Sequence, residues 1–240
     1  EEKLKYTKKG VVIPLMYESW ELREEDIDMK FCQQRKVSIA GTNERHPNID
    51  VFNYTGDMAI KLIFDSGKCL YNNSFVLISN NDFGPFIAKA VSKLCSKLGV
   101  IDLEKNKKNY NLSGNCKWIS NFPEIKSTRE FKDAEAIILT ASPFVDTWID
   151  TKGIISTDSI MRAFSNPDVL RFTGHVNTEA LDADSISYYP QSVPRGHMGI
   201  LLSDIGYDSV IRLQAGGLKV AEEMLNNKWD SKYIQPIIQY

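Results

Sequence analysis

The chain has 240 residues, of which 42% are hydrophobic and 25% charged, with a formal net charge of −2 at pH 7. This length allows one large domain or two small ones with a sizeable core. The balance of charge gives no electrostatic signature of binding to nucleic acid or to an anionic membrane. We find no apolar run long enough to span a bilayer, and the ten N-terminal residues are too polar for a signal peptide.

We therefore expect a cytoplasmic protein that binds a small-molecule substrate, with neither nucleic acid nor membrane as a partner. The four cysteines form no CxxC pair and show no metal-ligand spacing, so no metal site is expected.

The first 70 residues predict a smaller α/β region. Short apolar runs at 11–13 and 37–40 are typical of strands, and the spacing of apolar residues predicts helices over 18–30 and 55–67. Clear strand–helix alternation begins only after residue 70.

Residues 75–78 form a continuous apolar run, as expected of a strand buried on both faces. A polar turn follows, and apolar residues then recur at helical spacing over 83–98, with Gly99 placed to end the helix. The turn sets the free N–H groups of a helix N-terminus beside the carboxyl end of a strand, where α/β sheets bind phosphates. We expect cofactor-binding residues here: Ser79, Asn80, Asn81, Asp82, Phe83 and Gly84.

A second buried strand over 136–140 ends in the small polar residues Thr140, Ala141 and Ser142, which join the expected cofactor site. Further strands are predicted over 153–157, 169–172 and 210–214. The fold class is therefore α/β, with a Rossmann-like parallel sheet and helices on both faces over 71–215. Residues 216–240 predict a C-terminal helix that packs back over the N-terminal layer.

His175 and Glu179 are four residues apart, so on a helix they would share one face. A carboxylate that orients an imidazole and raises its pKa suits a general acid or base. Alternatively, Asn177 or Thr178 caps a short helix and Glu179 satisfies its first turn. Both interpretations stay open.

Residues 194–199 hold two further candidate catalytic residues, Arg195 and His197, beside Gly196 and Gly199, in a loop where the backbone can approach a ligand closely. Arg195 suits a carboxylate or phosphate. A surface turn is an equally good interpretation of this loop. A metal site built from His175, Glu179 and His197 has no supporting motif.

Three passages, at 75–99, 131–143 and 169–180, resemble the NAD-dependent D-2-hydroxyacid dehydrogenases, the formate and glycerate dehydrogenase group. The resemblance implies NAD or NADP as cofactor and hydride transfer on a small hydroxy or keto acid. It makes His175 the acid/base, held in place by Glu179. No residue cleanly matches the family's catalytic arginine, and in the leading hypothesis Arg195 helps to hold the substrate carboxylate. A homodimer is a further open expectation.

The chain departs from the glycine fingerprint G-x-G-x-x-G, because the turn offers only Gly84 and brings Asp82 toward the phosphate position. Asp102 and Glu104 are near the expected ribose-binding position, but no second strand is predicted before them. Two alternatives therefore stand beside an NAD(P)-dependent oxidoreductase. One is a non-catalytic Rossmann-like module for small-molecule binding or assembly, and the other is an S-adenosylmethionine-dependent transferase.

Overall fold

The computed structural model describes residues 6, 8, 10–112, 114–119 and 129–240. The chain divides into two compact units. The small unit comprises Glu1–Phe52 and Gly206–Tyr240, and the large unit comprises Asn53–Ile205. The sequence pattern places these boundaries at residues 70 and 215, whereas the contacts between residues place them at 52 and 205. Most of the helix that precedes residue 70 therefore belongs to the large unit.

The large unit contains a six-stranded parallel sheet with the strand order β11-β9-β6-β3-β4-β5. The strands are β3 (Ser74–Ser79), β4 (Lys97–Ile101), β5 (Cys116–Ile119), β6 (Ala136–Thr140), β9 (Asp168–Thr173) and β11 (Tyr188–Tyr189). A short parallel sheet, β10-β7-β8, lies in the same unit. Its strands are β7 (Thr147–Asp150), β8 (Ile155–Ser156) and β10 (His175–Val176). The Rossmann-like prediction is confirmed.

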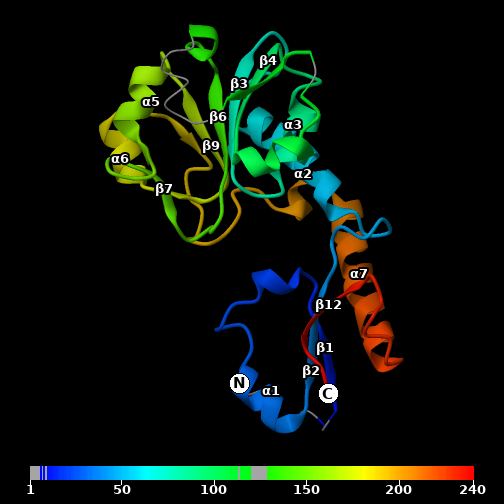
Figure 1. Cartoon of the computed structure of the whole chain (residues 1–240). Helices are drawn as coiled ribbons and strands as arrows, with labels where there is room; N and C mark the ends of the chain where they lie inside the picture. Colours follow the sequence, from blue (N-terminus) through cyan, green and yellow to red (C-terminus); the bar gives the residue numbers. More distant parts are fainter. Residues whose placement is uncertain (1–5, 7, 9, 113, 120–128) are drawn as a thin grey trace. The chain divides into compact units, whose positions relative to one another are not determined.

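Helices cover both faces of the six-stranded sheet (Figure 1). The side chains of Leu77 and Leu170 point into one core with α2 (Val51–Asp65) and α3 (Gly84–Val91). Those of Val76 and Ile137 point into a second core with α5 (Thr157–Ala163) and α6 (Thr178–Ala183). Because successive residues of each strand enter different cores, the central strands are apolar throughout, as the sequence predicts.

In the small unit, β1 (Val12–Pro14) pairs parallel with β2 (Ser38–Thr42), and β12 (Ile234–Ile238) pairs antiparallel with β2. The unit also contains α1 (Met29–Arg35) and α7 (Tyr207–Leu225). Helix α7 packs against β1 and β2, so a C-terminal helix covers the N-terminal layer as predicted (Figure 1). The helix predicted over 216–240 is wrong in extent, because α7 ends at Leu225 and Ile234–Ile238 form β12. Short 3₁₀ helices complete the two units: η2 (Ser19–Glu21), η3 (Glu104–Asn109), η4 (Arg129–Phe131) and η5 (Leu202–Ile205).

The strand predicted over 210–214 is wrong, because these residues form part of α7. The β-branched residues Val210 and Ile211 are typical of a strand, and Gly216 and Gly217 look like a break after it. These glycines lie within α7 and instead allow other side chains to pack closely against it. A Cβ on Gly216 would lie 2.6 Å from Ile49 Cδ1, and one on Gly217 would overlap Met16.

Two predicted helices are also wrong in extent. The helix expected over 83–98 ends at Val91, and Gly99 lies inside β4 rather than capping a helix. A Cβ there would lie 3.1 Å from the Phe131 ring, so glycine at this position lets that ring pack closely against β4. The helix expected over 18–30 is reduced to η2, and α1 begins only at Met29.

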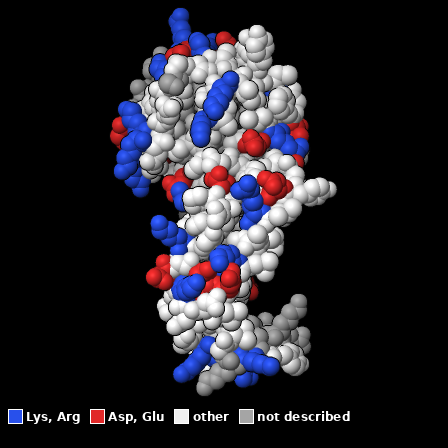
Figure 2. Space-filling view, turned by 90° about the vertical axis from the view of Figure 1, so that its right-hand side faces the viewer, with Lys and Arg blue, Asp and Glu red and all other residues white. Residues whose placement is uncertain are grey.

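On the face shown in Figure 2, the side chains of Lys and Arg are interspersed with those of Asp and Glu. Within the described part of the chain, no helix is both long and apolar enough to cross a membrane. The absence of nucleic-acid and membrane partners stays a prediction.

The helical state of residues 210–214 can be tested at Ile211, whose side chain is 63% exposed. Ile211→Ala should leave the free energy of unfolding unchanged or raise it by a few tenths of a kcal/mol (up to about 0.5), because alanine favours a helix more than isoleucine does. In a strand the same change would destabilise by up to about 1 kcal/mol. Urea denaturation measures the difference. Ile211→Gly, expected to be about 1 kcal/mol less stable than the alanine variant, serves as the control.

Candidate functional site

The carboxyl ends of β3 and β6 are joined by side chains that the sequence assigns to a cofactor. The Asn80 amide donates to the Ser142 carbonyl at 2.7 Å and accepts from the Ser142 N–H at 2.8 Å. This two-way pair fixes the loop after β3 to the loop after β6. Asn80 and Ser142 therefore lie together as predicted, but they are bonded to each other.

Asn81 extends this connection to β9. Its amide nitrogen lies 3.2 Å from Ser142 Oγ and 3.5 Å from Thr173 Oγ1. Its amide oxygen accepts from Thr140 Oγ1 at 3.2 Å and from the Phe83 N–H at 3.1 Å. We call Asn80, Asn81, Thr140, Ser142 and Thr173 the edge network.

The remaining predicted cofactor residues lie around this network. Ser79 Oγ bonds to the backbone of Asn81 at 3.2 and 3.3 Å, and the Ala141 N–H donates to the Thr173 carbonyl at 3.1 Å. Asp82 lies exposed in the turn, and the Phe83 ring packs edge-on against Phe172. Most polar groups of the edge network therefore have hydrogen-bond partners within the protein.

Asp102 directly follows β4 and is 4% exposed. The sequence shows no convincing strand before this residue, and the structure corrects that interpretation. Its carboxylate accepts from the Tyr110 hydroxyl, from Asn106 Nδ2 at 2.8 Å and from the Leu103 N–H at 2.5 Å. Burial, and then the bond to Asp102, raise the pKa of Tyr110, so its hydroxyl stays a donor. In Rossmann folds an acidic residue near this position binds a ribose hydroxyl.

The start of α3 determines whether a dinucleotide pyrophosphate fits. The fingerprint aligns here as Ser79-x-Asn81-x-x-Gly84, so only its third glycine is present. Pro85 has no N–H to offer, and the Phe83 N–H is taken by the Asn81 side chain. A Cβ on Gly84 would overlap the Tyr110 hydroxyl, which shows that the phenol covers the first residue of the helix. The residues present do not fit a pyrophosphate at this terminus.

His175 and Glu179 line one pocket of about 290 Å³, together with Thr147, Asp150 and Asn177. Asn177 caps α6 through a 3.2 Å bond from the Ala180 N–H, and Glu179 lies in the first turn of that helix. The capping interpretation is therefore the one that the structure adopts. His175 lies before the helix, on β10, and its buried Nδ1 has no hydrogen-bond partner among the described residues.

The pKa of His175 is lowered, first by burial and then by the positive charges of Arg171 and Arg195. A pairing with Glu179 would raise it, so the expectation of a carboxylate-activated imidazole is wrong. The neutral ring is favoured at neutral pH. Arg171 was not among the candidate residues, because a single arginine inside an apolar strand carries no recognisable motif.

Arg195 and His197 lie in an exposed loop that is held to the segment after β6. Arg195 Nε donates to the Val145 carbonyl at 2.9 Å, and His197 Nδ1 lies 3.1 Å from the Arg195 carbonyl. No hydrogen bond within the described residues joins His197 to His175. The four predicted catalytic residues are therefore not assembled into one bonded group.

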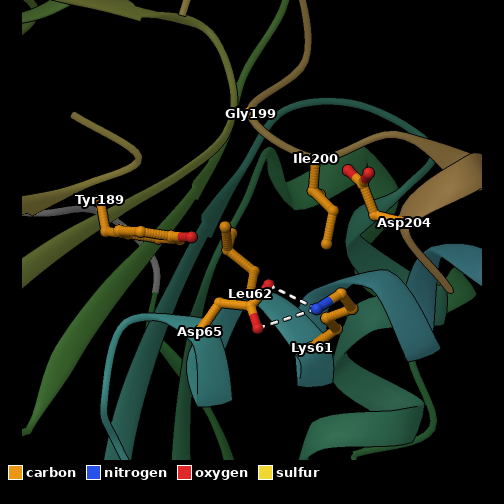
Figure 3. Close-up of a pocket in the computed structure, with 7 residues that line it drawn as sticks. All are labelled: Lys61, Leu62, Asp65, Tyr189, Gly199, Ile200 and Asp204. Carbon is orange, nitrogen blue, oxygen red and sulfur yellow. Dashed lines mark hydrogen bonds and ion pairs between the residues drawn. The ribbon is translucent and has the colours of Figure 1, made fainter. Parts of the chain in front are cut away.

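A second pocket, of about 280 Å³, contains none of the predicted site residues (Figure 3). Lys61 points toward Asp65 and bonds to both of its carboxylate oxygens, at 2.8 and 2.7 Å. Asp204, on another wall, accepts from the Leu201 N–H at 2.8 Å. Because its charged groups have partners, this pocket is the weaker candidate for a ligand.

The small unit contains three glutamates that the sequence does not single out. Glu18 is 2% exposed and accepts from Trp20 Nε1 at 2.6 Å and from Gln235 Nε2 at 3.1 Å. Burial is the main cause that raises the pKa of Glu44 to about 9 and that of Glu21 to about 7, and the charge of Glu18 adds to both shifts. Within the described chain, no group of three His, Cys, Asp or Glu side chains is arranged to hold a metal ion.

No protein-family model and no curated protein sequence matches the chain. Solved structures do match it. NAD-dependent formate dehydrogenase from Staphylococcus aureus, in complex with NAD, is 15% identical with a TM-score of 0.57, over 99% of this chain and 86% of that one. Dipicolinate synthase A chain from Bacillus subtilis is 9% identical with a TM-score of 0.56, over 93% of this chain and 80% of that chain.

D-lactate dehydrogenase with NAD⁺ from Lactobacillus jensenii is 13% identical with a TM-score of 0.51, over 98% of this chain and 80% of that chain. The resemblance to the D-2-hydroxyacid and formate dehydrogenases is thus confirmed for the fold. At these identities the similarity establishes a dehydrogenase-like architecture and does not establish the activity.

The raised pKa of Glu44 predicts how stability depends on pH. Folding binds a proton to this carboxyl between its ordinary pKa of 4.5 and about 9, so stability is greatest below this window and falls as pH rises through it. The slope is at most about 1.4 kcal/mol per pH unit for one group. Glu44→Gln should flatten this fall and make the protein more stable than wild type at pH 8 to 9.

Urea denaturation over a pH series measures the effect. Glu25→Gln, at an exposed position, is the matched control and should keep the wild-type slope. Equal slopes for wild type and Glu44→Gln would contradict a protonated Glu44.

Proposed function

We propose that this chain is a non-catalytic binding module with dehydrogenase architecture, in which the protein's own side chains take up the site where related folds hold a dinucleotide. Its large unit keeps the Rossmann-like sheet, and the carboxyl edge of that sheet is the region where such folds bind ligands. The ligand we expect is a small molecule rather than NAD or NADP.

The observation that carries this proposal is the Tyr110 hydroxyl, which lies against Gly84 at the start of α3 and is bonded to Asp102. This one side chain occupies two positions that a dinucleotide needs, the helix N-terminus for the pyrophosphate and the acidic residue for the ribose. Asn81, at the second position of the fingerprint, adds a side chain where glycine admits the pyrophosphate.

The candidate catalytic residues support the same proposal. His175 lacks the carboxylate partner that would tune it as an acid or base, and Arg195 and His197 are held in an exposed loop. A general acid or base needs a reacting group within hydrogen-bond reach and a suitable pKa. Neither requirement has support from the contacts of these side chains.

The second candidate is an NAD(P)-dependent oxidoreductase that acts on a small hydroxy or keto acid. One observation favours it: Asp102 directly follows β4, the position of a ribose-binding carboxylate. The formate and D-lactate dehydrogenase structures, solved with NAD and NAD⁺, add to this candidate through their fold. It requires Tyr110 to leave Asp102 when the cofactor binds. Nothing in the described residues specifically favours an S-adenosylmethionine-dependent transferase.

Calorimetric titration with NAD, NADP and S-adenosylmethionine, one at a time, separates these candidates. For wild-type protein that unfolds cooperatively, we expect no binding heat at ligand concentrations up to about 1 mM, which corresponds to binding weaker than about −4 kcal/mol. Tyr110→Phe removes the hydroxyl that lies against Gly84 but leaves Asn81 at the second position of the fingerprint, so it should likewise show none.

Micromolar binding of a nicotinamide cofactor would overturn the proposal. In that case Asp102→Asn should weaken the binding at least tenfold if the carboxylate holds the ribose. Glu104→Gln is the matched control, because that carboxylate bonds at the surface to Lys107 and Trp118 and should not affect cofactor affinity.

A further inference from the structure

Arg171 is a buried charge without a partner. It lies on β9, is 3% exposed, and its Nε is fully buried with no hydrogen-bond partner. Its guanidinium makes no hydrogen bond or ion pair with any of the residues that the structure describes. Because an arginine side chain remains protonated in proteins, this site holds a positive charge that the chain itself does not neutralise.

Such a charge is unfavourable in a folded protein. Buried ionic groups are normally paired or bound to an ion, since removal from water is costly. No Asp or Glu of the described chain is among the charges that act on the pKa of Arg171, and the charge of Tyr188 only opposes the lowering that burial causes. The free protein therefore has a positive charge and unused N–H donors beside its main sheet.

Two more nitrogen-bearing side chains adjoin this position. His175 follows β9 closely in the chain and has a buried Nδ1 without a partner among the described residues. Its backbone N–H donates to the Asp146 carbonyl at 3.1 Å, and Arg195 Nε donates to the adjacent Val145 carbonyl at 2.9 Å, so both residues are attached to one short segment. The charges of Arg171 and Arg195 also lower the pKa of His175. The loop that carries Arg195 is held against β9, because the Gly199 N–H donates to the Phe172 carbonyl at 2.9 Å.

We propose that Arg171, His175 and Arg195 form a binding site for an oxyanion, the carboxylate or phosphate group of a small metabolite. The planar guanidinium of Arg171 presents Nε and Nη donors that match two oxygens of such a group. His175 supplies a further nitrogen, and the Arg195 guanidinium can approach from the exposed side. Lys61, in the other pocket, is already paired with Asp65 and offers no comparable charge.

The proposal does not depend on the absence of dinucleotide binding. Arg171 lies on β9, while the edge network and Tyr110 determine what can bind at the start of α3. The oxyanion site would be present whether or not a cofactor binds elsewhere in the large unit.

The test is thermal unfolding of the whole chain in phosphate and in oxalate, with chloride as the reference at equal ionic strength. An anion that binds only the folded state raises the unfolding midpoint as its concentration increases. We expect wild type to respond to at least one oxyanion beyond the chloride reference. A response to phosphate alone indicates a phosphoryl ligand, and a response to oxalate alone indicates a carboxylate ligand. A response to both indicates a site that accepts either group.

Arg171→Gln should act in two opposite ways. Without an oxyanion it should unfold at a higher temperature than wild type, because the unpaired charge is gone. With phosphate or oxalate it should lose the added stabilisation, with affinity at least tenfold weaker. Arg162→Gln removes an exposed arginine that is paired with Asp158, and it should keep the wild-type response. A response that persists in Arg171→Gln, or no response in wild type, overturns the proposal.

A second measurement covers the case in which Arg171→Gln fails to fold. The chain has three histidines, so the ring signals of His175 can be assigned by NMR with a His175→Asn variant. Binding of an oxyanion beside the two arginines should raise the pKa of His175 in the wild-type protein and leave His46 unaffected. An unchanged His175 titration in saturating phosphate and in oxalate would count against the site.

Discussion

The two-way bond between Asn80 and Ser142 is the interaction that defines the functional edge of this protein. A parallel sheet ends with the polar backbone and side-chain groups of several strands at one edge, and these groups need partners. In a cofactor-dependent Rossmann fold, glycines keep the backbone open there for the ligand. Here Ser79 and Asn81 stand at the first two glycine positions, and the neighbouring Asn80 bonds to Ser142 at 2.7 and 2.8 Å. Once the loops after β3 and β6 are joined in this way, neither is open to a pyrophosphate.

Tyr110 adds a second contact at the start of α3. Its hydroxyl requires a buried acceptor, and Asp102 requires a buried donor, so each satisfies the other. Gly84 leaves just enough room for the phenol beside the helix. The third glycine of the fingerprint therefore keeps a role in packing, although the first two positions have changed. The backbone here follows a Rossmann-like fold, while the side chains at the start of α3 differ from the glycine fingerprint.

Much of this could be predicted from the sequence, for physical reasons that vary with the element. The strands β3 and β6 are buried on both faces, so their continuous apolar runs indicated them directly. The apolar run of β9 also indicated a strand, although Arg171 interrupts it. Strand β4 was missed, because its apolar residues continue the helical spacing of α3 and the turn between them contains no proline or glycine. The residues of the polar edge were found, since short polar turns after buried strands are visible in the sequence. Their partners were not, because a bond across 62 residues leaves no local pattern.

Asp102 and Arg171 show why burial of charge is more informative here than any motif. Both are nearly inaccessible to water, with 4% and 3% of their surface exposed. Asp102 follows a strand and is surrounded by a hydroxyl, an amide and a backbone N–H, so its charge is stabilised within the chain. Arg171 is in the middle of a strand and has no such shell among the described residues. A folded protein can satisfy a buried charge from inside or leave it for a ligand, and the two residues represent these two solutions on one sheet. Asp102, at the acidic position of the fold, is bonded within the chain, while an arginine at an unremarkable place in the sequence holds the charge that a ligand can neutralise.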